Sequence, residues 1–267
     1  MVKFPVKISN KLIRNRLTVD SDCSTNLSST EIKIIIMLAS VIKPEQKEFL
    51  LHKISVREFC KFWNVGYGGA QIKSVSKAIA QLASQKFRID NNIFSWLDST
   101  SKTDNGIMYL KFDDSLSVYL LDLKSNYTKF DINNIIDLKS KDSIYLYLYF
   151  KSLVSQGHYN LTLENAYKIL GNGRYFTKSE FERNILKKSI CEINAKTDIN
   201  VSWKYVENFG YPEIIRFFIK SKEEHPQRTT VKQPKTACID IFVDDKEPIF
   251  YPLYDRIEFA NENELPF

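Results

Sequence analysis

The sequence predicts an α+β fold in which one plan of helices and strands occurs twice along the chain. Each copy contains an amphipathic helix, a short second helix, a turn, a lysine-bearing third helix and two strands joined by a polar loop. Two helices that frame a turn, followed by a β-hairpin, form a winged helix. We therefore expect two winged-helix domains in tandem, an arrangement that points to duplex DNA as the partner.

The first copy begins with a helix that Ser28 or Ser29 can cap and that Pro44 stops, because proline cannot continue a helix. Ile54 to Trp63 reads as a short second helix capped at Ser55. The turn after it is marked by three glycines, Gly66, Gly68 and Gly69.

The third helix of the first copy is predicted from Ala70 to Ser84, where apolar residues recur at intervals of three and four. Its buried stripe consists of Ile72, Val75, Ile79 and Leu82. The opposite face carries the candidate DNA contacts Lys73, Lys77 and Gln81. Strands are then expected at residues 86–90, 93–97 and 107–112, with the polar loop 98–106 as the candidate wing.

In the second copy, Leu161 to Leu170 reads as a short helix opened by Thr162, and Gly171-Asn172-Gly173 ends it with residues that tolerate positive φ. A longer helix follows from about Thr177 to Ile193. Its apolar side consists of Phe181, Ile185, Leu186, Ser189, Ile190 and Ile193. Its other side carries Arg183, Asn184 and Lys187, with Lys178 in the first turn. An apolar back and a basic front suit a recognition helix.

Two strands complete the second copy, at Asn200–Val206 and Glu213–Lys220. The turn-rich segment 207–212 between them is long enough to form a wing. Between the two copies, the run Ile144–Phe150 alternates like a strand and is rich in aromatic residues that prefer strands. We predict a helix here, because Ser140, Asp142 and Ser143 precede it as caps and Gln156-Gly157 closes it. Its tyrosines are expected in the core rather than as platforms for stacked bases.

Several stretches resemble the Rep_3 family of plasmid replication initiators over roughly residues 8 to 220. They are Asn10–Thr18, Tyr127–Phe130, Leu138–Tyr147, Ile185-Leu186, Glu192–Asn194 and Thr197–Ile199. The run Leu138-Lys139-Ser140 before an aromatic helix is the most specific of them. The resemblance implies two winged-helix domains that bind repeated origin sequences (iterons), open an adjacent AT-rich stretch with host proteins and repress their own promoter.

The exposed basic faces give each candidate contact a role by geometry. Arg183 can read guanine and Asn184 can read adenine in a major groove, whereas an ammonium such as that of Lys187 more often holds phosphate. The other candidate contacts are Lys178, Lys73, Lys77, Gln81, Arg14 and Arg16. Of these, the two arginines are expected along the DNA backbone or in a minor groove. The alternative for each is a solvated basic face.

The charge is unevenly distributed along the 267 residues, whose net charge is +6. Residues 223–267 hold five basic and ten acidic side chains, a net charge of −5, so the preceding residues carry +11. A basic body with an acidic tail fits a polyanionic partner. We expect an N-terminal domain at 1–126 for DNA binding and dimerisation, a C-terminal domain at 127–222 as the main sequence-specific reader, and a linker and tail at 223–267.

Other classes of protein lack the residues that they need. The four cysteines are widely spaced, so neither a disulfide framework nor a zinc site is expected, and a reducing cytoplasm is the simplest compartment. The longest apolar run, Ile34–Ala39, is far shorter than the ~20 residues of a membrane span. The chain has no phosphate-binding loop of the form G-x-x-x-x-G-K-[ST], and its histidines are isolated. The acidic pairs Asp113-Asp114 and Asp244-Asp245 are expected to be solvated. We expect no enzymatic activity, cofactor or metal.

Two further partners are expected. A homodimer in the DNA-free form would use residues before about 126, with edges near residues 93–97 and 107–112, and the apolar segment 116–127 would repack when a monomer binds direct repeats. Host replication proteins are the others: an initiator, a helicase or a sliding clamp. The last five residues, 263–267, resemble short clamp-binding peptides. A tandem winged-helix repressor and a structural adaptor remain as alternatives.

Overall fold

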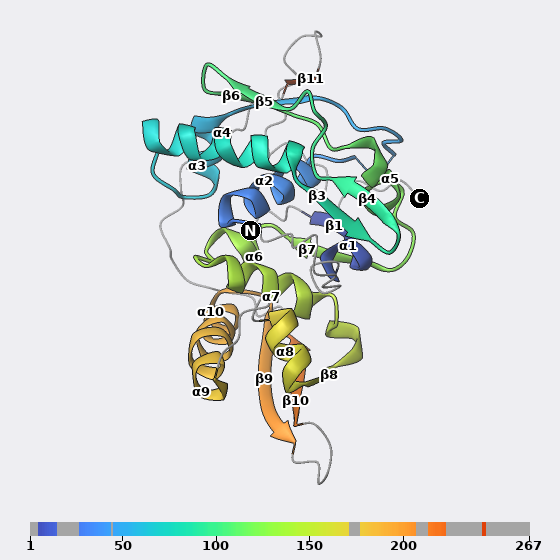
Figure 1. The fold of residues 1–267 in the computed structure, drawn as a ribbon, viewed down its shortest axis with the longest axis vertical. Helices are drawn as coiled ribbons and strands as arrows, with labels where there is room; N and C mark the ends of the chain where they lie inside the picture. Colours follow the sequence, from blue (N-terminus) through green and yellow to red (C-terminus); the bar gives the residue numbers. More distant parts are fainter. Residues whose placement is uncertain are drawn as a thin grey trace, which may run out of the picture.

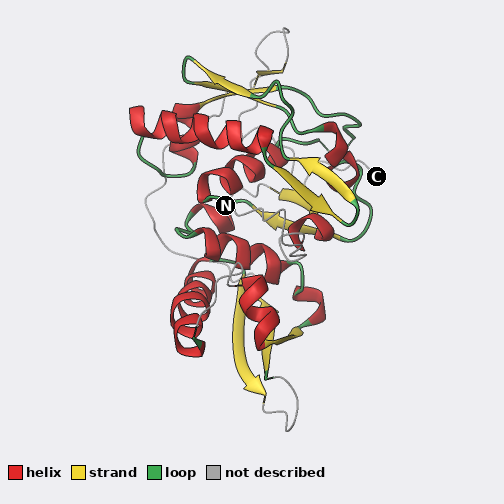
Figure 2. Ribbon diagram, viewed as in Figure 1, coloured by secondary structure: helices red, strands yellow, loops and turns green. Residues whose placement is uncertain are grey.

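The computed structural model describes residues 5–14, 27–43, 45–170, 177–206, 213–222 and 242–243. Two winged-helix units lie one above the other in Figures 1 and 2. Helix α7 (Lys141–Lys151) lies between them and packs against α1 (Asn10–Arg14) and α2 (Ser29–Ser40) on one side and α10 (Lys188–Lys196) on the other. The predicted α+β fold of two tandem winged helices is confirmed.

The first unit is built around α2, in which every residue from Glu31 to Ala39 is buried. The other elements are β2 (His52–Ser55), α3 (Val56–Phe62), α4 (Gly69–Ser84), β5 (Lys102–Asp104) and β6 (Ile107–Leu110). In the sheet, β6 lies between β2 and β5. The expected edge at residues 107–112 is therefore wrong, because β6 forms hydrogen bonds to a neighbour on each side.

The wing of the first unit is smaller than the sequence predicts. Residues 98–106 were expected to form a polar loop, but β5 occupies part of this range and pairs with β6. The turn between these strands is made by Asn105 and Gly106, whose φ values are 48° and 77°. An Asn-Gly pair with positive φ is typical of a tight two-residue hairpin. The wing is thus this hairpin, because strand pairing overrides the polar character of Lys102–Asp104.

A second hairpin, β3 (Lys86–Ile89) and β4 (Asn92–Ser95), is inserted between α4 and β5. It forms a separate two-stranded sheet. Lys11 of α1 forms an ion pair with Asp90 in its turn, so the hairpin is fastened to the start of the chain. The expected edge near residues 93–97 remains available on β4.

The second unit repeats the plan of the first. It consists of α7, β8 (His158–Thr162), α8 (Leu163–Leu170), one long helix and two strands, β9 (Ile199–Val206) and β10 (Ile214–Ser221). The long helix comprises α9 (Lys178–Phe181), a π-helical stretch over Glu182–Lys187 and α10. The strand order β8-β10-β9 corresponds to β2-β6-β5 of the first unit.

The helices begin where the sequence predicts, because polar caps satisfy their first backbone N–H groups. Ser28 and Thr177 each form a capping box with the glutamate three residues later. Ser55 accepts from the backbone N–H of Arg57, and Thr162 accepts from that of Asn165.

Helix α7 confirms that the aromatic run is helical, but it ends at Lys151, before the predicted close at Gln156-Gly157, where a separate 3-10 turn ends. Ser140 caps it by accepting from the backbone N–H of Ser143, and every residue from Ser143 to Phe150 is buried. A helix that is buried on all sides can carry apolar residues at every position, so the alternating pattern does not distinguish it from a strand. The polar residues that cap its N-terminus do.

The start of the chain contacts the entrance to the second unit. Strand β1 (Pro5–Ser9) pairs antiparallel with β7 (Tyr127–Asp131), which follows the expected domain boundary after residue 126. The segments around β7 are short: a 3-10 turn at Asp114–Leu116, α5 (Ser117–Leu120), α6 (Asn133–Ile136) and a 3-10 turn at Val154–Gln156. The pairing connects the start of the chain to the segment that leads into the second unit.

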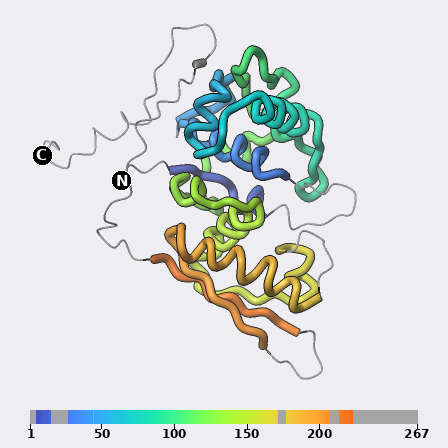
Figure 3. The backbone as a smooth tube through the Cα atoms, turned by 90° about the vertical axis from the view of Figure 1, so that its left-hand side faces the viewer, coloured from blue at the N-terminus to red at the C-terminus, as the bar shows by residue number. Residues whose placement is uncertain are grey.

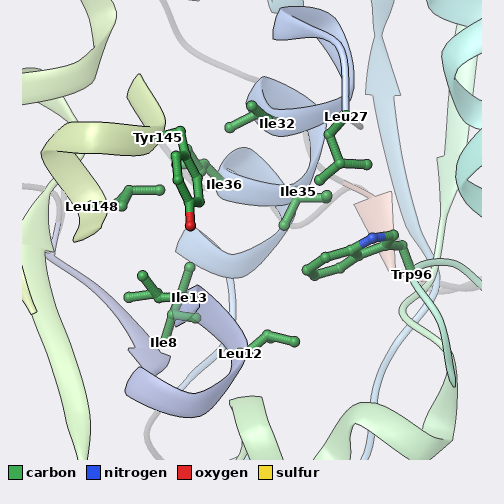
Figure 4. Close-up of a pocket in the computed structure, with 10 residues that line it drawn as sticks. All are labelled: Ile8, Leu12, Ile13, Leu27, Ile32, Ile35, Ile36, Trp96, Tyr145 and Leu148. Atoms are coloured by element: carbon green, nitrogen blue, oxygen red, sulfur yellow. The ribbon is translucent and has the colours of Figure 1, made fainter. Parts of the chain in front are cut away.

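An apolar cavity of about 70 Å³ lies where the units meet, as Figure 4 shows. Its lining residues are Ile8, Leu12, Ile13, Leu27, Ile32, Ile35, Ile36, Trp96, Tyr145 and Leu148. Only a tyrosine hydroxyl and an indole N–H bring polarity to this set. The packing around this cavity between the units is therefore mainly apolar.

Part of the tail returns to the first unit. Strand β11 (Phe242–Val243) pairs antiparallel with β2 and so occupies the outer position of its sheet. The expectations for Pro44, Gly171–Gly173, the wing tip 207–212, Asp244-Asp245 and the last five residues lie outside the described residues. Within the described ranges, no helix is long and apolar enough to cross a membrane.

Candidate nucleic-acid interface

Each unit contains one long helix that precedes the strands of its wing, α4 in the first unit and the helix α9–α10 in the second. The N-terminal part of α4 and the helix α9–α10 both lie on the left-hand side of Figure 1, the side that faces the viewer in Figure 3. Each is followed by the strands of its own wing. The arrangement brings the two helices that the sequence predicts as recognition helices to one side of the chain.

Helix α4 has the two faces that its sequence predicts. Val75, Ala78, Ile79 and Leu82 are buried, whereas Lys73, Lys77 and Gln81 are exposed. Neither lysine has an acidic partner among the described residues. Two unneutralised ammonium groups one turn apart on an exposed helix are suited to contact phosphates.

The start of α4 adds two residues that the sequence analysis missed. Gly68 occupies the cap position and offers no side-chain acceptor, so the first N–H groups of the helix are not covered by a cap. Beside it in the turn, Tyr67 is 47% exposed, and the guanidinium of Arg57 lies 5.1 Å from its ring centroid. Arg57 is exposed at the start of α3, where Val56 and Phe59 are buried. This contrast is the signal that could have identified it.

The helix α9–α10 also has the predicted faces. All six residues of the predicted apolar stripe are buried, and Arg183, Asn184 and Lys187 are exposed. Arg183 donates from Nε to Oδ1 of Asn184 over 3.4 Å and has no acidic partner in the described part of the chain. The guanidinium and the amide therefore lie together on the exposed face.

Lys187 is partly neutralised by an acid on the same helix. Its Nζ lies 2.7 Å from Oε1 of Glu182, five residues earlier. Side chains five residues apart can meet here because the π-helical stretch over Glu182–Lys187 widens the turn. The sequence pattern assumed a regular helix, in which positions three and four apart are neighbours, and it therefore missed this pair.

Lys178 is held against the wing strands rather than left free. It forms an ion pair with Glu213 beside β10, and its Nζ lies 4.0 Å from the ring centroid of Tyr205 on β9. These contacts fasten the start of the recognition helix to the base of the wing. They reduce the charge that Lys178 can offer to phosphate.

The far end of the recognition helix is tied to α7. Glu192 accepts from the backbone N–H of Lys139 and from Nζ of Lys196, both at 2.9 Å. Burial of Glu192 favours its protonated form, but its hydrogen bonds to Ser143, Lys196 and Lys139 outweigh this effect and hold the pKa below its usual value. Asn194 exchanges two hydrogen bonds with the backbone of Val201 in β9. The helix is thus fixed at both ends.

Arg14 is placed differently from the expectation that it follows DNA. Its guanidinium donates to Oγ of Ser152 over 3.1 Å and to the backbone carbonyl of Ser152 over 2.9 Å. Ser152 caps the C-terminus of α7, where a positive charge is favoured by the helix dipole. This role lies within the protein, so we omit Arg14 from the interface. Arg16 lies outside the described residues.

The acidic pair Asp113-Asp114 lies outside these helices and contacts neighbouring residues of its own segment. Asp113 accepts from the backbone N–H of Ser115, and Asp114 forms an ion pair with Lys111. Across the described ranges, no group of three His, Cys, Asp or Glu side chains could hold a metal ion. What the geometry does provide is two exposed helices, basic side chains and adjoining wings. These features define a tandem winged-helix protein of the kind that binds nucleic acid.

Comparison with known families agrees with this class. The model of the initiator replication protein WH1 domain matches residues 5–151, and that of the initiator Rep protein WH2 domain matches residues 161–212. The chain therefore belongs to the family of initiator replication proteins. No curated protein matches it.

A solved structure shares the fold. It is described as the crystal structure of Pi initiator protein in complex with iteron DNA, and it superposes with a TM-score of 0.66 at 16% sequence identity. The similarity covers 84% of this chain and 100% of that chain. Both winged-helix units thus have a counterpart in one known initiator fold.

Proposed function

We propose that the chain is a plasmid replication initiator that binds directly repeated origin DNA, or iterons. The observation that carries this proposal is the presence of two exposed recognition helices, α4 and α9–α10, in one chain of the initiator family. Direct repeats have no two-fold symmetry, so one chain with two different readers fits one repeat. We expect the two helices to enter successive major grooves, about one helical turn or ~34 Å apart.

The two helices are expected to divide the work of recognition. Arg183 and Asn184 have the donors and acceptors that read guanine and adenine, and no acid neutralises the arginine in the described structure. Lys73 and Lys77 offer point charges to phosphates, and Arg57 and Tyr67 extend the same surface at the start of α4. Lys187 joins the phosphate contacts when it leaves Glu182. The second unit thus specifies the sequence, and the first unit mainly adds affinity.

Origin opening is expected to use binding energy rather than a catalysed reaction. Neighbouring iterons filled with protein would strain the adjacent AT-rich duplex, and host replication proteins would then load onto the opened strands. We place this activity in the cytoplasm. Binding to an inverted repeat at its own promoter would let the same protein repress its synthesis.

A DNA-free homodimer is part of the proposal, because an inverted operator suits a two-fold dimer whereas direct repeats suit a monomer. The first unit supplies a suitable surface in the β3–β4 hairpin and α5, where Ile93 is 59% exposed and Val118 is 70% exposed. Phe94 of β4 contacts Tyr119 of α5 with ring centroids 5.5 Å apart, so these two elements form one surface. We refer to Ile93, Val118 and their two elements as the hairpin surface.

Equilibrium binding of single-residue variants tests the division of work. Arg183→Ala should reduce the preference for the repeat over random duplex by about ten-fold or more, since a bidentate base contact is worth about 1–3 kcal/mol. Lys73→Ala should weaken both complexes equally and lower the salt slope by about 0.9. Lys124→Ala is the matched control, because this lysine is 82% exposed and lies outside both helices. If Arg183→Ala left affinity and preference unchanged, α9–α10 would not be the reader.

The repressor without a replication role is the remaining alternative. It would use the same recognition helices, so binding alone does not separate the two. Replication of a plasmid that carries only the gene and its flanking repeats does separate them. An initiator supports such replication, and a pure repressor does not.

A further inference from the structure

The outer edge of the first unit's sheet is covered by the chain's own tail. Phe242 and Val243 of β11 pair with Lys53 and His52 of β2. Without β11, β2 would be an edge strand with a row of unpaired backbone N–H and C=O groups, the kind of edge to which another strand adds. The edge is thus a strand-accepting surface with one occupant in place.

The exposed face of the same sheet carries a row of basic and aromatic side chains. Lys53 of β2, Tyr109 of β6 and Lys102 of β5 stand directly opposite one another in the strand register. The two ammonium nitrogens lie 5.8 Å and 6.0 Å from the centroid of the tyrosine ring. The described residues provide no acidic partner for either lysine. Two unneutralised cations beside one ring favour an anion near them.

The register brings this row into line with β11. Phe242 pairs with Lys53, which in turn pairs with Tyr109, so the backbone of the tail strand lies next to the strand that carries Lys53. In the sequence, the two strand residues are preceded by Asp240 and followed by Asp244, Asp245 and Glu247. A strand flanked by four acids in the sequence therefore adjoins a face with two lysines that have no acidic partner within the described ranges.

The chain is long enough for this contact within one molecule. Nineteen residues separate Lys222 from Phe242, and an extended segment of that length can span about 60 Å. The charges are also complementary, since residues 223–267 carry a net charge of −5 and the rest of the chain +11. An acidic strand tethered to a basic body has a high effective concentration at a fitting surface.

We propose that the β2 edge and the Lys53-Tyr109-Lys102 row form a docking site for the chain's own acidic segment 237–247, and that the docked segment weakens non-specific DNA binding by the first unit. The second part rests on the proposed function. Non-specific affinity arises from release of counterions when lysines meet phosphates, so acids held within a Debye length of about 8 Å of those lysines lower it. Base contacts of α9–α10 lie in the other unit and are affected less. The tail thus favours repeats over random DNA.

Hydrogen exchange of the full-length, DNA-free protein tests the docking by itself. Val243→Pro removes a backbone N–H and cannot be accommodated in a paired strand. It should speed exchange of the β2 amides to the rate seen after deletion of residues 237–267. Thr236→Pro is the matched control outside β11 and should leave β2 protected. Equal β2 exchange in the wild type and in Val243→Pro would overturn the docking site. Protection that grew with protein concentration would assign the edge to a second copy's tail instead.

Binding to random-sequence duplex at low salt tests the consequence. Val243→Pro should release the acidic segment from the sheet. The double variant Lys53→Gln/Lys102→Gln should instead remove the two lysines that the acids are proposed to screen. We expect Val243→Pro to bind random duplex at least about five-fold more tightly, with a smaller gain on the repeat. If β2 opened but random-DNA affinity stayed the same, the docking would stand and its effect on DNA would be wrong. If the wild type did not bind the repeat more tightly than random duplex, the proposed function itself would be refuted.

Discussion

His52 is a buried histidine on the strand that accepts the tail. Its side chain is 6% exposed, and its Nδ1 has no hydrogen-bond partner in the described structure. Burial lowers its pKa from 6.5 to about 4, because the protonated ring would lose its hydration. Since the folded pKa is lowered, the unfolded chain binds more protons between these values. Stability is therefore fully present above pH 6.5 and is lost as the pH falls toward about 4.

Urea unfolding at several pH values tests this. The free energy of unfolding should fall by up to about 3 kcal/mol between pH 6.5 and 4 from this group alone. His52→Leu has no ring to protonate. The difference in the free energy of unfolding between the variant and the wild type should therefore change by that amount between pH 6.5 and 4. Parallel curves for the two proteins between pH 6.5 and 4 would show that His52 is not the titrating group.

The environment of a candidate site residue could be predicted where it depends on one helix, and could not where it depends on a side-chain contact with a distant part of the sequence. The exposure of Arg183 and Lys73 could be predicted because it follows from the period of one helix, and the structure shows both side chains exposed. The roles of Arg14 and Lys178 were not, because Ser152 and Glu213 lie far away in the sequence. The contact between Arg57 and Tyr67 was not predicted either, because it depends on the path of the turn between α3 and α4.

In the helix α9–α10 of the second unit, an acidic side chain partly neutralises one of the basic side chains. Glu182 holds Lys187 at 2.7 Å, and this acid is only 27% exposed while the lysine is 64% exposed. An acid on a surface that meets phosphates opposes binding, and it also withholds a cation from the DNA.

Glu182→Gln should release Lys187 and strengthen DNA binding. We expect higher affinity for repeat and random duplex alike, and a salt slope steeper by up to about 0.9, the value for one added phosphate contact. Binding titrations at several salt concentrations measure both quantities. A selective loss of repeat binding would contradict this account and would mean that Glu182 accepts from a base, as glutamate does from cytosine N4.

Elements with capping residues and a clear period were predictable, and short paired strands were not. The helices at Ser29–Ser40, Gly69–Ser84 and Lys141–Lys151 begin within a residue or two of their predicted starts. Strand β2 was missed because His52–Ser55 directly precedes a helix and was read partly as its first turn. Strand β5 was missed because three polar residues show no apolar alternation. Only pairing with β6 makes them a strand.

The whole molecule is expected to change its oligomeric state with the symmetry of the DNA. The free protein should sediment as a dimer held through the hairpin surface, and its complex with one direct repeat should contain one chain. Ile93→Glu places a charge on this surface and should shift the free protein to a monomer without loss of repeat binding. Lys129→Glu, at the exposed position of β7, is the control for an added negative charge. The same stoichiometry in the free protein and in the complex would remove the switch and leave DNA binding intact.

The apolar joint between the units gives such a change a physical basis. The cavity of about 70 Å³ between α1, α2 and α7 means that packing there is incomplete, and no charged side chain lines it. A turn of one unit against the other would change these apolar contacts and would also break the hydrogen bonds from Arg14 to Ser152. The pairing of β1 with β7 is a further connection between the units.

Hydroxyl-radical footprinting on a single repeat from the DNA beside the gene is the decisive experiment, because it shows where each winged helix lies on the duplex. We expect two protected patches on one face of the duplex, about one helical turn or ~34 Å apart from centre to centre. Lys73→Ala with Lys77→Ala should weaken one patch, and Arg183→Ala should weaken the other. A single protected patch, unchanged by the variants of one unit, would contradict binding by both winged helices of one chain.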